Sequence, residues 1–311
     1  MISSVSSVVG GGSFTSIGGM GSGVRVYGVL DAWEDYEPES IAYALHSNGV
    51  AVCTLNVPDK LNPLTANSVQ EMFILLEHME RDDRVRCALW TGAGDRAFTA
   101  GADFKELLAP APPRVKLPVQ YRNLYAGRGK ASFTADLALK ALTMAFLDFP
   151  KPSVCAVNGL AVGGGANIAL LFHDLVVCSD KARFQYPFAS LGIPPELSSS
   201  LLLPLIVGPA RAKRLLYLGE WFSAQDAVDL GLANAVVPHA EHADHAMALA
   251  AKLAALNPAA LLLSKSLLNG HRRADIERAC DAENRAINAA MRSPEFQATL
   301  KRFAPKPKAK L

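Results

Sequence analysis

Two apolar runs near the start of the chain, Ile41–Leu45 and Val50–Leu55, are separated by Ser47-Asn48-Gly49. Short apolar runs on either side of an Asn-Gly pair are typical of antiparallel strands joined by a tight turn, so a β-hairpin is predicted there. Residues 1–23, in contrast, are rich in Ser and Gly and have no sustained periodicity. They are interpreted as a flexible leader ahead of the folded core.

A helix is predicted after the hairpin, because apolar residues recur three and four positions apart. These residues are Val69, Met72, Phe73, Leu76 and Met79. Ser68 and Glu71 lie three residues apart near its start, which is the spacing of a capping box.

Further strands are predicted at Val85–Trp90, Val154–Val157 and Leu175–Cys178, where the sequence is strand-like and mostly apolar. Helices are predicted over Ala131–Phe146 and from near Gly164. Strand–turn–helix units therefore repeat through the first two thirds of the chain, which predicts an α/β core.

The chain becomes mostly helical after about Pro209. One helix there is predicted to have a face that is apolar except for one glutamate. The residues at helical spacing on this face are Ile276, Cys280, Glu283, Ile287 and Met291. Asp281 and Arg285 are spaced for an ion pair within the same helix. The expected divisions are a core at 24–208, a helical region at 209–303 and a basic tail at 304–311.

Composition and charge exclude several classes of function. Half of the 311 residues are hydrophobic, which is enough for one large core or two smaller ones. The formal net charge is +2, and the basic residues are dispersed except at the C-terminus, which argues against a nucleic-acid-binding protein. No apolar run approaches the length that crosses a bilayer. The five cysteines show no paired spacing, which indicates buried thiols in a reducing compartment; a nucleophilic cysteine is the alternative.

Two glycine turns carry the candidate chemistry. Phe98–Asp103 contains Gly101, and Asn158–Asn167 contains Gly163-Gly164-Gly165 directly before a predicted helix. Backbone N–H groups at such places can hold an anionic oxygen, and two donors aimed at one oxygen are typical of acyl-group activation. Taken separately, each turn is equally consistent with a tight turn or with close packing of a helix on a sheet.

Glu196 follows the two turns and is the acid placed like a catalytic base. Its neighbours Pro194, Pro195 and Leu197, and the apolar run Leu201–Val207, would partly desolvate the carboxylate and suit it to proton exchange. A solvated loop carboxylate is the alternative. One carboxylate beyond two backbone donors predicts enolate chemistry rather than hydrolysis or hydride transfer.

Several long motifs, in this order, resemble the crotonase superfamily, also called the enoyl-CoA hydratase/isomerase family. They are Pro58–Pro63, Arg96–Phe104, Lys151–Gly165 and Ala224–Leu232. The resemblance covers roughly residues 41–303 and implies a spiral of ββα units followed by a helical trimerisation region. It implies backbone N–H donors at Ala102 and Gly164. The residues that would border the CoA ester are Lys60, Leu61, Ala100, Gly101, Asp103 and Phe104.

The chain departs from the hydratase pattern at two positions. Hydratases of this family place one glutamate just after the triple glycine and a second in a Q-P-E run, whereas this chain has Asn167 and Phe188 there. The run Tyr186–Glu196 instead looks like the peroxisomal Δ3,Δ2-enoyl-CoA isomerase branch. In that branch a single glutamate, here Glu196, is the acid/base, and an apolar wall such as Phe188 would keep water from the intermediate.

The resemblance therefore implies an enzyme that moves the double bond of a 3-enoyl-CoA to the 2-position. It implies no metal or redox cofactor, and a homotrimer or a pair of trimers. An enoyl-CoA hydratase of unusual design and a non-catalytic acyl-CoA-binding module are the alternatives. The terminal Ala309-Lys310-Leu311 is close to the S-K-L signal, which implies a peroxisomal import receptor as partner, unless the chain ends this way by chance.

Other motifs are set aside. Gly92–Ala97 formally fits a dinucleotide-binding pattern, but no acid follows about twenty residues on, so an NAD site is not expected. For the histidines His239, His242 and His245, a solvated first helical turn is favoured over a metal site. The chain has no G-x-S-x-G and no H-E-x-x-H, which removes support for those hydrolases.

Overall fold

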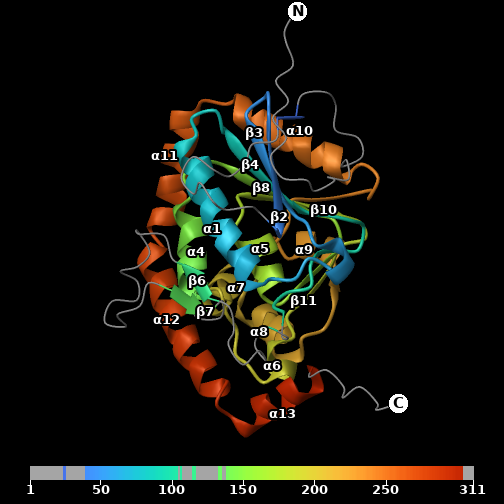
Figure 1. The fold of residues 1–311 in the computed structure, drawn as a ribbon, viewed down its shortest axis with the longest axis vertical. Helices are drawn as coiled ribbons and strands as arrows, with labels where there is room; N and C mark the ends of the chain where they lie inside the picture. The colour runs from blue at the N-terminus through green and yellow to red at the C-terminus, as the bar shows by residue number, and fades with distance from the viewer. Residues whose placement is uncertain are drawn as a thin grey trace, which may run out of the picture.

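A large sheet forms the centre of the molecule (Figure 1). The computed structural model describes residues 24–25, 39–103, 106, 114–116, 132–134 and 138–303. The seven strands, in spatial order, are β1 (Val24–Arg25), β2 (Ile41–His46), β3 (Val50–Leu55), β4 (Cys87–Gly92), β8 (Ser153–Val157), β10 (Leu175–Ser179) and β13 (Ala235–Val237). The pairs β1–β2 and β2–β3 are antiparallel, and all later neighbours are parallel.

A second sheet of four short strands lies beside the first. Its strands, in spatial order, are β12 (Phe222–Ser223), β11 (Arg183–Gln185), β9 (Leu160–Val162) and β5 (Ala97–Thr99). Three of them follow closely after a strand of the large sheet, so β4 leads to β5, β8 to β9 and β10 to β11. The pair β8–β9 is followed by helix 164–171 and the pair β10–β11 by helix 188–191, in agreement with the ββα units that the resemblance implied.

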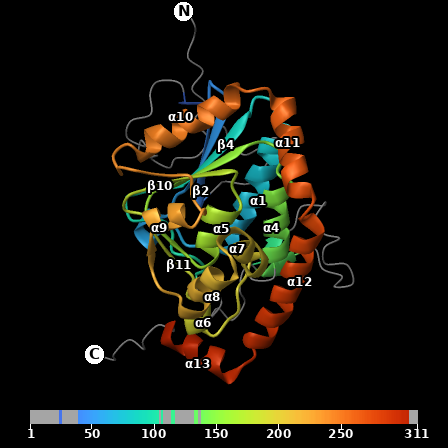
Figure 2. The same cartoon turned by 180° about the vertical axis from the view of Figure 1, so that it is seen from behind.

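The helices cover both faces of the large sheet and extend to one side (Figures 1 and 2). They are α1 (Ala66–Arg81), α4 (Leu139–Asp148), α5 (Gly164–Leu171), α6 (Phe188–Leu191), α7 (Ser199–Val207), α8 (Pro209–Leu218), α9 (Ala224–Asp229), α10 (His242–Ala255), α11 (Pro258–Gly270), α12 (Arg273–Ala290) and α13 (Pro294–Phe303), with a 3₁₀ turn at Pro58–Lys60. In both views α11 and α12 run along one side of the molecule and α13 turns beneath it.

The core has two parts because successive strand residues face opposite sides of the sheet. On one face, Ala51 and Cys53 pack with α1 and α4 in the larger cluster. On the other face, Val50 and Val52 pack against the small side chains of α10, among them Ala246. All six residues of β3 are buried, as expected for a strand covered on both sides.

The predicted hairpin is confirmed, with Gly49 in the left-handed region at φ = 82°. The predicted helix is also confirmed as α1, but the predicted capping box is wrong. Thr65 is the N-cap, and Thr65 and Ser68 cap each other reciprocally. Glu71 is instead 1% exposed, and its carboxylate accepts the backbone N–H groups of Glu39, Ser40 and Ile41 at 2.6–3.1 Å.

Two further predictions from the sequence are corrected. Ser132–Thr134 form strand β7, paired with β6 (Arg114–Lys116), and the helix predicted from residue 131 begins at Leu139. Phe and Thr favour a strand once a partner strand is available. Asp281 pairs not with Arg285 but with Lys140 of α4, whose nitrogen lies 2.8 Å away. A buried lysine requires a partner more than an exposed arginine does.

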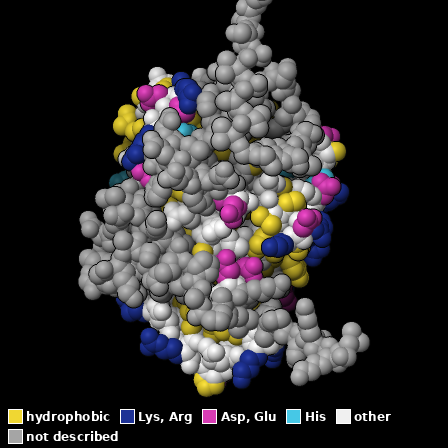
Figure 3. Space-filling view, in the orientation of Figure 1, with side chains coloured by type: hydrophobic (Ala, Val, Ile, Leu, Met, Phe, Trp, Pro, Cys, Tyr) yellow, Lys and Arg dark blue, Asp and Glu magenta, His cyan; other side chains and the backbone are white. Residues whose placement is uncertain are grey.

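The surface agrees with the charge pattern of the sequence. On the face shown in Figure 3, the described Lys and Arg side chains are scattered among acidic and apolar ones. Among the described helices, none alone has the length and apolar composition to cross a membrane; only α10 and α11, bent by 104°, reach that composition as a pair.

We expect the substitution Glu71→Gln to lower the free energy of unfolding by about 1–3 kcal/mol, because an amide NH₂ would face buried backbone donors. Urea denaturation measures this. The control is Glu220→Gln, which removes an exposed partner of Arg214 and should change stability by less than about 0.5 kcal/mol. Equal losses in the two variants would contradict the role of Glu71.

All five cysteines are buried and free. Burial raises the pKa of Cys87, Cys178 and Cys280 to about 12, and raises the pKa of Cys53 and Cys155 further. We therefore expect that no thiol of the native protein reacts with a colorimetric reagent at a pH near 8.5, which is about the pKa of an exposed thiol. All five should react in denaturant, and a rapidly reacting native thiol would restore the nucleophilic alternative.

Candidate active site

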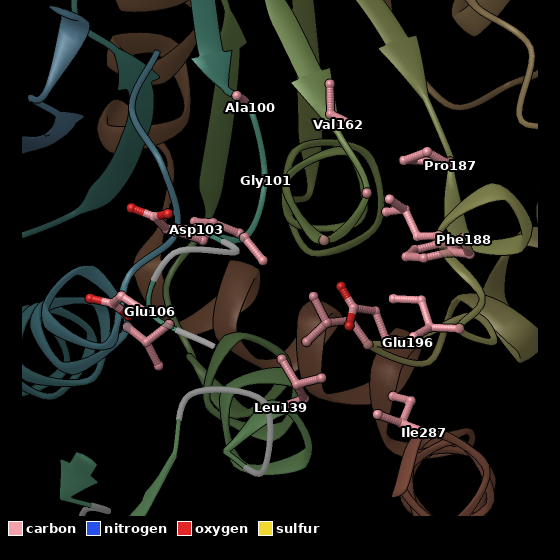
Figure 4. A pocket seen from close by; sticks show the side chains of 18 of the residues that line it. Ala100, Gly101, Asp103, Glu106, Leu139, Val162, Pro187, Phe188, Glu196 and Ile287 are labelled. Carbon is pink, nitrogen blue, oxygen red and sulfur yellow. The ribbon is translucent and has the colours of Figure 1, made fainter. Parts of the chain in front are cut away.

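A cavity of about 120 Å³ lies where the small sheet, α5 and the C-terminal helices meet (Figure 4). Its lining is mostly apolar and comes from distant parts of the chain: Leu64, Val69, Ala100, Gly101, Ala102, Asp103, Glu106, Leu139, Leu142, Val162, Gly163, Gly164, Pro187, Phe188, Leu191, Ile193, Glu196, Leu197, Ile287, Met291 and Phe296. The two predicted glycine turns and the predicted base therefore face one space.

The first turn is held by a short parallel bridge to Leu64. The Leu64 N–H donates to the Gly101 carbonyl at 2.8 Å, and the Asp103 N–H donates to the Leu64 carbonyl at 3.1 Å. Because backbone groups alternate in direction along an extended segment, the N–H of Ala102 points away from Leu64. Ala102 is exposed and lines the cavity, as a donor to a bound ligand must.

Gly101 is required for this turn. Its φ is +84°, and a Cβ atom there would lie 2.6 Å from the Val162 carbonyl oxygen at the end of β9. No side chain fits such an approach, so β9 and the turn pack closely only because residue 101 is glycine.

The second turn begins α5. Gly163 is the N-cap at φ = 56° and donates its N–H to the Gln185 carbonyl at 2.9 Å. Gly164 is the first residue of the helix, so its N–H has no partner within α5 and carries part of the positive end of the helix dipole. A Cβ atom on Gly165 would lie 2.3 Å from Cγ2 of Thr99, so α5 packs directly on β5.

Glu196 lies in the loop between α6 and α7, and its carboxylate points into the cavity (Figure 4). Its Oε1 would be 2.7 Å from a Cβ atom on Gly164. The residue is half-buried, and Leu64 and Leu197 also lie close to Gly164. The alternative of a solvated loop carboxylate therefore does not describe this side chain. A carboxylate beside backbone donors in an apolar cavity can transfer protons next to an oxygen that becomes anionic.

Asn167 and Phe188 stand at the two positions where the resemblance to hydratases described above implies glutamates. Asn167 is fully buried, is absent from the cavity lining, and donates from Nδ2 to the Glu196 carbonyl at 2.9 Å. Phe188 is 2% exposed, lines the cavity and stacks on Tyr186. Phe188 thus contributes an aromatic side chain to the cavity lining.

Two other carboxylates line the cavity, but in Figure 4 both point away from Glu196. Oε2 of Glu106 accepts the Ala66 N–H at 2.9 Å, which joins this residue to the start of α1. Burial raises the pKa of Glu106. The hydrogen bond from Ala66 opposes this shift, and the negative charge of nearby Asp103 adds to it. Glu106 was not among the residues predicted from the sequence, although it lies three residues after the first turn.

The remaining predicted residues border the site or cannot be placed. Ala100, Gly101 and Asp103 line the cavity. Lys60 and Leu61 do not, although the Leu61 carbonyl accepts the Ala100 N–H at 2.9 Å and so lies against the turn. Phe104 lies outside the described residues.

The residues that close the cavity on the far side were not predicted from the sequence as part of the site. They are Leu139 and Leu142 of α4, Ile287 and the adjoining Met291 of α12, and Phe296 of α13. Ile287 and Met291 belonged to a predicted apolar face, but periodicity does not say what a face packs against.

The family model described as enoyl-CoA hydratase/isomerase matches residues 46–311 of this chain. A short-chain-enoyl-CoA hydratase of Clostridium acetobutylicum is 32% identical over 259 residues, which cover 83% of this chain and 92% of that protein. The peroxisomal enoyl-CoA delta isomerase 3 of Mus musculus is 30% identical over 265 residues, which cover 85% of this chain and 78% of that protein. Relatives at this level of identity thus include both hydratases and isomerases.

The fold agrees with these similarities. The crystal structure of an enoyl-CoA hydratase/isomerase from Pseudoalteromonas atlantica superposes with a TM-score of 0.74 at 29% identity, covering 86% of this chain and all of that chain. The predicted crotonase fold, an α/β core with a helical C-terminal region, is therefore confirmed. Because the family model spans most of the sequence, this chain belongs to the enoyl-CoA hydratase/isomerase family.

Proposed function

We propose that this protein is a Δ3,Δ2-enoyl-CoA isomerase with Glu196 as its acid/base. The observation that carries the proposal is the position of one carboxylate, Glu196, against Gly164 in an apolar cavity. The side chains at the two family glutamate positions are a buried amide, Asn167, and an aromatic ring, Phe188. Neither position therefore supplies a carboxylate for the activation of water by two carboxylates. A proton shuttle needs only one carboxylate.

The proposed reaction uses Glu196 twice. Its carboxylate removes a proton from C2 of a 3-enoyl thioester. The electron pair of that C–H bond forms a C1=C2 double bond, and the carbonyl π pair moves onto the thioester oxygen, which gives a dienolate. The negative charge that develops on the thioester oxygen is held by the N–H groups of Ala102 and Gly164. The protonated Glu196 then returns the proton to C4. The C3=C4 pair forms the new C–H bond, the C1=C2 pair moves to C2=C3, and the oxygen pair re-forms the carbonyl, which leaves a 2-enoyl thioester and the starting carboxylate. Phe188 and the other apolar side chains would keep water from the intermediate.

The CoA part of the substrate would lie along the turn at Ala100–Phe104, beside Lys60 and Leu61. The reaction moves a proton within one molecule and changes no oxidation state overall, so we propose no cofactor beyond the CoA that the substrate carries.

A hydratase is the second candidate, because a relative similar in length is named a short-chain-enoyl-CoA hydratase. It would have to activate water with Glu196 alone, or with a carboxylate such as Glu106 turned inward. A module that only binds acyl-CoA is the third, but it would not need a carboxylate beside Gly164.

We expect Glu196→Gln to lower kcat for the isomerisation of 3-hexenoyl-CoA by at least about 10²-fold, because acid–base catalysis contributes at least that much. The conjugated thioester product is followed by its absorbance, and binding of the CoA ester by calorimetry should be little changed. The matched control is Glu71→Gln, which changes a buried glutamate away from the cavity and should retain kcat. Full turnover by Glu196→Gln would remove this residue from the mechanism. Hydration of a 2-enoyl-CoA by the wild type without isomerisation would favour the hydratase.

A homotrimer, or a pair of trimers, is part of the proposal, and the helical region supports it. No residue of the 13-residue α11 is buried. Its leucines Leu262, Leu263, Leu267 and Leu268 are 44–77% exposed. Apolar faces of this kind usually mark interaction sites. A second exposed apolar group, Tyr217, Leu218 and Trp221, lies at and just after the end of α8, so two different surfaces are available for a closed ring of identical subunits.

We expect the wild type to sediment as a trimer or hexamer, and the double variant Leu263→Asp, Leu267→Asp to dissociate, because a carboxylate cannot be buried unpaired in an apolar contact. Analytical ultracentrifugation measures this. Circular dichroism of the variant, which should keep its helix content, provides the control. A monomeric wild type at the concentrations of the assay would contradict the trimer.

A peroxisomal location, with an import receptor as partner, also stays a proposal. The residues on which it depends, Ala309-Lys310-Leu311, lie outside the described residues. It is supported by the similarity of this tail to the S-K-L signal and by the relative named as peroxisomal.

A further inference from the structure

The backbone directly after Glu196 has an unfavourable conformation. Leu197 and Ser198 have φ values of 55° and 57°, in the left-handed region that residues other than glycine seldom occupy. Leu197 is 2% exposed and Ser198 is fully buried. Such a conformation persists only where surrounding contacts impose it, so the contacts around this loop determine where the Glu196 carboxylate points.

One set of contacts holds the carbonyl group of Glu196 itself. Its oxygen accepts hydrogen bonds from Nδ2 of Asn167 at 2.9 Å and from Oγ of Ser199 at 2.6 Å. The backbone N–H of Ser199 donates to the same oxygen at 3.1 Å. Asn167 belongs to α5, the helix whose first residue is Gly164, so this amide ties the base to the helix that supplies a backbone donor.

A second set of contacts comes from a carboxylate more than eighty residues later in the chain. Glu283 of α12 is 5% exposed. Its Oε2 accepts the Ser198 N–H at 2.7 Å, and its Oε1 accepts the Ser200 N–H at 2.9 Å. Hydrogen bonds to an ionised acceptor are stronger than neutral ones. Burial raises the pKa of Glu283, and the donors at Ser198 and Ser200 oppose that shift.

Glu283 also replaces a missing helix cap. Ser198 is the N-cap residue of α7, yet its side chain makes no capping bond and instead donates to the Leu197 carbonyl at 2.7 Å. The carboxylate of Glu283 supplies the acceptor that the start of α7 lacks, at the end of the helix where a negative charge is favourable.

We propose that Glu283 is a positioning residue for the catalytic base: its carboxylate fixes the loop at residues 197–200 so that Glu196 stays against Gly164. This inference rests on the proposed function only in calling Glu196 the base. One turn further along the same face of α12, Ile287 lines the cavity, so α12 both closes the cavity and holds the loop.

The test compares Glu283→Gln with Glu71→Gln. Both change a buried glutamate that accepts two or more backbone N–H groups, but Glu71 does so at Glu39–Ile41, away from the cavity. We expect Glu283→Gln to lower kcat for 3-hexenoyl-CoA by roughly 10- to 100-fold with KM little changed, because a small misplacement of a catalytic group has costs of that size. Glu71→Gln should keep kcat when rates are normalised to folded protein.

Hydrogen–deuterium exchange gives a readout that does not depend on the reaction. Glu283→Gln should speed exchange at the amides of Ser198 and Ser200, and Glu71→Gln should speed it only near Ile41. Glu283→Asp keeps the charge on a shorter side chain and should lie between the wild type and Glu283→Gln in both readouts. This variant also serves if Glu283→Gln does not fold.

Unchanged kcat in folded Glu283→Gln would overturn the inference, and so would equal losses of kcat in Glu283→Gln and Glu71→Gln. Unchanged exchange at Ser198 and Ser200 would overturn it as well. If the wild type does not isomerise 3-hexenoyl-CoA, the proposed function fails, and the exchange rates at these two amides still decide whether Glu283 holds the loop.

Discussion

The approach of the Glu196 carboxylate to the first residue of α5 depends on a missing methyl group. A Cβ atom at Gly164 would lie 2.7 Å from Oε1 of Glu196, a distance at which something has to move. The same absence of a side chain leaves the Gly164 N–H accessible at the positive end of the helix. Glycine at this position therefore brings together the two groups that the proposed chemistry requires, a proton acceptor and a donor for an anionic oxygen.

Close backbone packing produces that arrangement. Gly101 allows its turn to lie against the Val162 carbonyl, and Gly165 allows α5 to lie against Thr99 of β5. The two turns are far apart in sequence, but they end neighbouring strands of one small sheet and so face the same cavity. A Cβ atom at Gly101, Gly164 or Gly165 would lie 2.3–2.7 Å from a neighbouring atom, so this packing requires glycine at all three positions.

The C-terminal helices contribute to the site as well as to the surface. α12 places Ile287 in the cavity lining and, one turn earlier, Glu283 against the backbone that follows Glu196. Lys140 joins the same helix to α4, which supplies Leu139 to the cavity. α12 thus links the loop, the cavity and α4. By contrast, α11 contacts the core through Lys265, which binds the Lys151 carbonyl and Asp174, and leaves its leucines exposed.

The sequence by itself determined the elements whose causes are local. The two apolar runs on either side of Asn48-Gly49 predicted the hairpin, helical periodicity predicted α1 and α12, and the glycine turns with Glu196 predicted the candidate site. It could not determine which partner a polar side chain finds. Glu71 and Ser68 had the spacing of a capping box, and Asp281 and Arg285 that of an ion pair, yet Glu71 binds Glu39–Ile41 and Asp281 binds Lys140.

Only the tertiary structure decided those pairings, because burial makes an unsatisfied charge or N–H group costly and the available partners come from distant segments. Glu283 is the clearest case: in the sequence it interrupts an apolar face, and in the fold it caps a helix that begins at Ser199. The periodicity of the sequence indicates which residues are buried together. The three-dimensional packing determines which partner each buried polar group binds.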